Sequence, residues 1–86
     1  MERLKKHFTD KVPPDFICPI TTMIFKDPVM TEDGNTYERE AIEAWFRTRN
    51  TSPLTNMPLA SKKLIPNITL RKLIDQFIEE NHGVVS

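Results

Sequence analysis

The residues of this chain that could bind a metal or act as a nucleophile are few and far apart. The 86 residues include one cysteine, Cys18, and two histidines, His7 and His82, which lie near opposite ends. A structural zinc site takes four thiolate or imidazole ligands. These three side chains cannot complete one such site. The sequence therefore predicts no metal centre and no cofactor.

Cys18 could instead act as a nucleophile that carries a transferred group. A catalytic thiolate needs a neighbouring base or a positive field that lowers its pKa. Here the neighbours are Ile17 and Pro19, and no histidine is close in the sequence. We therefore expect Cys18 to be a packed structural thiol.

The composition indicates one small domain. A length of 86 residues, of which 38% are hydrophobic, allows a modest core. Lys and Arg number 12, as do Asp and Glu, so no overall field attracts nucleic acid or a membrane surface. A single cysteine excludes an internal disulfide, which favours the cytosol or the nucleus.

The first half of the chain predicts a lead-in, a loop, a hairpin and a helix. Residues 1–12 form either a short helix or a linker. The loop at 15–26 has four apolar anchors, which are Phe16, Ile17, Ile24 and Phe25. Strands at 28–31 and 36–37 flank turn residues that tolerate positive φ. A helix then runs from Glu38 to about Asn50, with an apolar stripe of Ala41, Ile42, Trp45 and Phe46.

The second half predicts another loop, a short strand and a second helix. The loop covers 51–58, and the strand lies within 59–65, before a proline. Asn67 or Thr69 caps the helix. Its apolar positions follow helical spacing and are Leu70, Leu73, Ile74, Phe77 and Ile78. Gly83 is the expected stop signal.

In this order the segments resemble the U-box family of ubiquitin ligases, which have a RING-like fold without zinc. The resemblance covers 13–80 and leaves 81–86 as a tail. The matching segments are PPDFICPI, DPV, GNTYERE, IEAWF, SPLT and IPN. The resemblance implies an α+β domain in which two loops flank a short β-hairpin and a central helix, followed by a C-terminal helix.

The resemblance also implies an activity, that of a U-box ubiquitin-protein transferase. Such a domain binds a ubiquitin-conjugating enzyme charged with ubiquitin and promotes transfer to a substrate lysine. It does so by positioning, without a covalent intermediate, so no catalytic nucleophile is expected. The partners are then the conjugating enzyme and ubiquitin, while the sequence does not identify the substrate.

The resemblance places the partner contacts on the two loops and the central helix. The implied contact residues are Ile20, Thr22, Trp45, Pro53, Thr55 and Asn56. Core packing is the alternative role for Ile20 and for Trp45. In the second loop, Pro53 is expected to point outward and Leu54 inward.

Asn56 departs from the family pattern. Active members often carry an arginine or another long polar side chain there, which bridges the conjugating enzyme and ubiquitin. Asparagine forms hydrogen bonds but is shorter and uncharged. Asn56 is therefore either the linchpin residue or only a loop-closing residue, and a non-catalytic docking module of the same fold remains the alternative function.

Without zinc, hydrogen bonds must hold the two loops. A buried polar group left without a partner costs about 1–3 kcal/mol. The candidate bracing residues are Asp27, Glu38, Arg39, Ser52, Thr55 and Asn67. Tyr37 is expected in the core, with its hydroxyl group bonded to a loop.

Two further interpretations concern partners. Two helices and a turn can imitate a DNA-binding helix-turn-helix, but residues 67–82 carry no basic stripe, so we expect no nucleic-acid partner. Homodimer formation through 1–12 or 69–82 is left open by the sequence.

Overall fold

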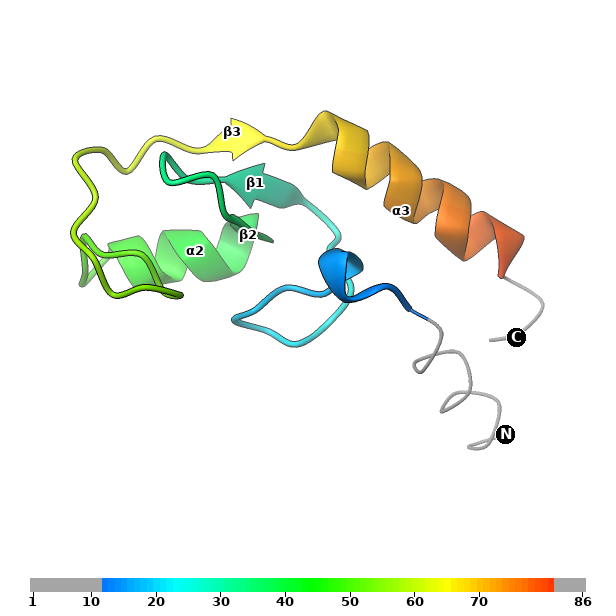
Figure 1. Cartoon of the computed structure of the whole chain (residues 1–86), viewed down its shortest axis with the longest axis horizontal. Helices are drawn as coiled ribbons and strands as arrows, with labels where there is room; N and C mark the ends of the chain where they lie inside the picture. Colours follow the sequence, from blue (N-terminus) through cyan, green and yellow to red (C-terminus); the bar gives the residue numbers. More distant parts are fainter. Residues whose placement is uncertain (1–11, 82–86) are drawn as a thin grey trace.

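The computed structural model describes residues 12–81 (Figure 1). The predicted lead-in therefore lies outside the described residues apart from Val12, as do His7, His82, Gly83 and all of the tail except Asn81. The elements are a 3₁₀ turn η1 (Pro14–Phe16), strands β1 (Pro28–Met30), β2 (Thr36–Glu38) and β3 (Ile65–Pro66), and helices α2 (Arg39–Phe46) and α3 (Ile68–Glu80).

The three strands form one antiparallel sheet in the order β2-β1-β3. Val29 in the central strand lies opposite Tyr37 on one side and opposite Pro66 on the other. The predicted hairpin is thus confirmed. Pro66 was expected to follow the strand but belongs to it, which is tolerated because β3 is an edge strand.

The hairpin turn is held by Asp33. Its carboxylate accepts hydrogen bonds from the Thr31 hydroxyl group and from the Asn35 side-chain amide. Gly34 adopts a φ of 86°, which a glycine reaches without strain. Desolvation alone would raise the pKa of Asp33, but hydrogen bonds from Thr31, Ser52 and Asn35 together lower it. These bonds therefore stabilise the fold above the ordinary Asp pKa, and their contribution is lost as the pH falls through the lowered value.

Helix α2 packs its apolar stripe against the sheet and loops. Ile42 and Phe46 are buried, and Trp45 packs partly buried against the same core. The helix ends at Phe46 and not at Asn50 as predicted. The Thr48 main-chain N–H donates to the Trp45 carbonyl oxygen, so the last turn tightens. The Lys62 ammonium group donates to the Phe46 carbonyl oxygen at 2.8 Å and satisfies that helix end.

Helix α3 begins at a side-chain cap. The Asn67 Oδ1 atom accepts from the Leu70 main-chain N–H at 3.1 Å, so the Asn67 alternative is confirmed. The Asn67 Nδ2 atom donates to the Thr36 hydroxyl oxygen and joins the helix to β2. In Figure 1 this helix extends away from the sheet. Neither described helix is long and apolar enough to span a membrane.

Helix α3 is present as predicted, but only part of its apolar stripe is buried. Ile74 is buried in the core, and Leu70 packs against that core, while the Phe77 ring meets the Phe16 ring edge-on at 5.5 Å between centroids. Leu73 and Ile78 are exposed, at 49% and 38%. The core consists of Cys18, Phe25, Val29, Tyr37, Ile42, Phe46 and Ile74.

The Asn67 cap makes a testable prediction about stability. Asn67→Ala removes both the cap and the bond to Thr36, so we expect the free energy of unfolding to fall by about 1–2 kcal/mol. Asn67→Asp keeps the capping acceptor and removes only the donor to Thr36, so it should lose less. Urea unfolding measures both variants. An equal loss in the two would show that the cap itself contributes nothing.

Candidate functional site

The first loop is closed by its own main chain. The Cys18 main-chain N–H donates to the Met23 carbonyl oxygen at 2.9 Å, and the Thr22 main-chain N–H donates to the Cys18 carbonyl oxygen at 2.8 Å. The Met23 main-chain N–H bonds the Thr21 hydroxyl oxygen at 3.2 Å. Residues 18–23 therefore form a tight, internally bonded turn.

The second loop repeats this arrangement. The Ser52 main-chain N–H donates to the Met57 carbonyl oxygen at 2.9 Å, and the Asn56 main-chain N–H donates to the Ser52 carbonyl oxygen at 2.7 Å. The Met57 main-chain N–H bonds the Thr55 hydroxyl oxygen at 3.2 Å. The two loops also have similar sequences, which are CPITTM at 18–23 and SPLTNM at 52–57. The sequence reasoning missed this repeat, which aligning the chain with itself could have found.

Both loops place a residue in the left-handed region of φ. Thr22 and Asn56, at equivalent positions, each have a φ of 60°. Asparagine tolerates this conformation, but for a β-branched threonine it costs about 1–3 kcal/mol. Such strain persists only where the surroundings hold it, and it is frequent at functional sites.

The first residue of each loop anchors it in the core. Cys18 is fully buried, and its Sγ accepts from the main-chain N–H groups of Ile20 and Glu38 at 3.4 and 3.3 Å. Ser52 is also fully buried, and its Oγ lies 3.3 Å from the Tyr37 hydroxyl oxygen. The expectation that Cys18 is a packed thiol is confirmed, as is the bond from the Tyr37 hydroxyl group to a loop.

Glu38 and Arg39 hold the end of the first loop. The two Glu38 carboxylate oxygens accept from the main-chain N–H groups of Lys26 and Asp27, both at 2.8 Å. Arg39 Nε forms a 2.8 Å ion pair with Asp27 Oδ2. Hydrogen bonds to a charged group contribute about 1.5–3 kcal/mol each, whereas partly exposed ion pairs contribute about 0–1 kcal/mol. The Glu38 carboxylate is therefore the stronger brace.

Trp45 joins α2 to the second loop. Its Nε1–H donates to the Thr51 carbonyl oxygen at 2.7 Å. The Arg49 guanidinium group lies 4.2 Å from the centre of the indole ring. The indole is only partly buried, so it contributes to the core and also reaches the surface between α2 and the second loop.

A further brace, Glu32, was not predicted. One of its carboxylate oxygens, Oε2, accepts from the main-chain N–H groups of Ala60 and Ser61 at 2.5 and 3.1 Å. It thereby ties the segment after the second loop to the hairpin turn. The partners lie 28 and 29 residues away, so no local pattern marks this contact.

The remaining predicted contact residues lie on the two loops. Ile20 is 36% exposed, Pro53 is partly buried, and Thr22, Thr55 and Asn56 are exposed. The prediction for Leu54 is wrong, because its side chain is 54% exposed. Residues 53–55 form a turn, and the buried Ser52 before it occupies the inward position.

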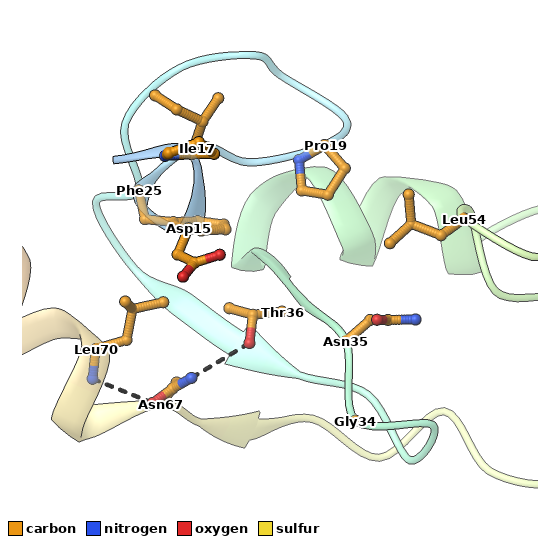
Figure 2. Close-up of a pocket in the computed structure, with 11 residues that line it drawn as sticks. Asp15, Ile17, Pro19, Phe25, Gly34, Asn35, Thr36, Leu54, Asn67 and Leu70 are labelled. Atoms are coloured by element: carbon orange, nitrogen blue, oxygen red, sulfur yellow. Dashed lines mark hydrogen bonds between the residues drawn. The ribbon is translucent and has the colours of Figure 1, made fainter. Parts of the chain in front are cut away.

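Two hollows flank the first loop. The larger, of about 390 Å³, lies between that loop, the hairpin turn and the start of α3 (Figure 2). Asp15 is its one charged lining residue, and Leu54 borders it from the second loop. The smaller, of about 170 Å³, lies between the first loop and the start of α2, and both Met23 and Glu40 line it. Neither hollow is lined by a cysteine or a histidine, and we therefore treat the surface of the loops as the candidate site.

The part of the chain from 12 to 81 also offers no metal centre. No group of three or more His, Cys, Asp or Glu side chains within it is placed to hold a metal ion. The loops in this range are held by the hydrogen bonds described above.

Known proteins contain the same sequence pattern. A family model described as the U-box domain matches residues 12–83. The WD repeat, SAM and U-box domain-containing protein 1 of Danio rerio is 59% identical over 63 residues, which cover 72% of this chain and 13% of that protein. The putative E3 ubiquitin-protein ligase LIN-1 of Lotus japonicus is 51% identical over 74 residues, which cover 83% of this chain and 5% of that protein. The chain thus spans a small part of the curated relatives that it matches.

A solved structure shares the fold. The RING finger-like domain of Retinoblastoma Binding Protein-6 superposes with a TM-score of 0.71 at 29% identity, covering 83% of this chain and 82% of that one. This likeness confirms the predicted small α+β, RING-like architecture. Together with the family model, which covers most of the chain, it shows that the chain belongs to the U-box family.

Proposed function

We propose that this domain recruits a ubiquitin-conjugating enzyme charged with ubiquitin and promotes ubiquitin transfer to a substrate lysine. The observation that carries the proposal is the pair of equivalent, internally bonded loops, which carry the exposed Ile20 and the partly buried Pro53 beside the helix of Trp45. Relatives named E3 ubiquitin-protein ligases support it.

Positioning is the mechanism that suits this surface. The described residues offer no exposed thiol, because the one cysteine is fully buried. Holding a flexible thioester-linked ubiquitin in an attack-ready arrangement lowers the entropic part of the barrier. A rate gain of tenfold to a hundredfold requires about 1.4–2.8 kcal/mol, which a few surface contacts supply.

The braces serve this mechanism by fixing the loops before the partner arrives. A surface that is already ordered loses less conformational entropy on binding, so more of the contact energy appears as affinity. Glu38 and Arg39 hold the first loop to α2, and Trp45 holds the second loop to the same helix. These contacts fix the position of the two loops relative to each other.

A docking module that binds the conjugating enzyme without accelerating transfer is the second candidate. The uncharged Asn56 favours it, since an exposed asparagine reaches less far than an arginine toward a bound ubiquitin. Lysine discharge of a charged conjugating enzyme, with and without the domain, separates the two. Binding without acceleration would favour docking.

Ile20 and Pro53 are expected to contribute to binding and little to folding. Ile20→Ala and Pro53→Ala should each weaken affinity for the conjugating enzyme by about tenfold, because each removes a contact from the centre of the surface. The thermal transition should shift little. Calorimetric titration and thermal unfolding measure the two effects. Ile78→Ala on α3 is the matched control, since Ile78 is 38% exposed and belongs to a helix that carries none of the proposed contact residues. An Ile20→Ala protein that unfolds would instead show a core role.

Asn56→Arg should raise the rate of lysine discharge several-fold while changing affinity for the conjugating enzyme much less. The reason is that the longer, charged side chain reaches farther toward a bound ubiquitin than asparagine does. The left-handed φ makes arginine cost about 1–2 kcal/mol of stability relative to asparagine. Single-turnover discharge and urea unfolding measure these changes. An unchanged rate would assign Asn56 a loop-closing role only.

Cys18→Ser should leave ubiquitin discharge within about twofold of the original rate. Serine already occupies the equivalent position of the second loop, where its oxygen accepts a main-chain hydrogen bond. The control is the unfolding curve of the same variant. Loss of discharge with folding and partner binding retained would establish a covalent role for the thiol.

A further inference from the structure

The two loops correspond atom by atom in their main-chain bonds, which allows their side chains to be compared position by position. Thr22 and Asn56 occupy the fifth position of each loop, where φ is left-handed. Met23 and Met57 occupy the sixth. Each methionine is held at both main-chain groups, by a bond from its N–H and a bond to its carbonyl oxygen. The two methionine side chains are therefore presented from the same kind of fixed backbone.

Both methionine side chains are unusually open to solvent. Met23 is 61% exposed and Met57 is 64% exposed, more than Ile20 at 36%. A single exposed apolar side chain is ordinary on a protein surface. Two at equivalent positions, each next to a proposed contact residue, form a recurring feature of the loops. Methionine is also enriched at protein interfaces.

Met23 lies on the side of the first loop that faces α2. It lines the smaller hollow together with Glu40 of that helix. The proposed binding surface consists of the two loops and α2, where Trp45 reaches the surface. Through this hollow the Met23 side chain adjoins the first turn of α2, which is one of the elements of the proposed surface.

We infer that Met23 and Met57 are a second pair of contacts for the conjugating enzyme and help to determine which of these enzymes bind. The inference rests on the proposed function and assigns residues that the family resemblance did not mark. The methionine side chain is unbranched and polarizable, so it adapts to differently shaped partner surfaces. The pair would let one rigid loop framework accept several conjugating enzymes.

The test measures affinities for a panel of purified ubiquitin-conjugating enzymes by calorimetric titration. Met23→Ala and Met57→Ala should each weaken binding by about fivefold, and the double variant by about the product of the two losses. The losses should differ between enzymes of the panel, because the methionines meet different surfaces. Thermal unfolding should change little, since both side chains are exposed.

Ile68→Ala on α3 is the control, because Ile68 is 62% exposed and lies outside the two loops and α2. It should leave every affinity unchanged. If Ile20→Ala weakens binding while both methionine variants bind like the original protein, this inference is wrong and the proposed function stands. If the original protein binds no enzyme of the panel, both are wrong.

Discussion

The structure depends most on one carboxylate at the junction of β2 and α2. Glu38 is the last residue of the hairpin. Its two carboxylate oxygens accept hydrogen bonds from the main-chain N–H groups of Lys26 and Asp27, where the first loop returns to the sheet. Its own main-chain N–H donates to the Cys18 sulfur atom at the start of that loop. One residue therefore fixes both ends of the loop relative to the central helix, and the loop surface follows from that constraint.

The loop repeat explains how polar groups suffice for this task. Each loop closes on itself through the same main-chain bonds, and its first residue is buried. That residue is a buried thiol in one loop and a buried hydroxyl in the other, Cys18 and Ser52. A sulfur or oxygen acceptor at the base, together with a carboxylate or an indole N–H beside it, orders each loop without a bound ion.

Much of the fold was predictable because local signals were strong. Turn residues marked the hairpin, helical spacing marked both helices, and Asn67 was one of two proposed caps. The errors concern features that apolar spacing does not report. Leu54 points outward because Ser52 takes the inward position. The early end of α2 follows from a tightened last turn and the Lys62 ammonium group on a terminal carbonyl oxygen. Periodicity carries none of this information, since these features depend on tertiary packing.

Amide hydrogen exchange of the two loops in protein dialysed against a chelator tests the central claim most directly. If polar side chains brace the loops, the main-chain amides of Thr22 and Asn56 stay protected after dialysis. In a Glu38→Gln variant, exchange should quicken in the first loop and stay slow in the second. Tightly bound stoichiometric zinc, with protection lost from both loops on its removal, would contradict the account.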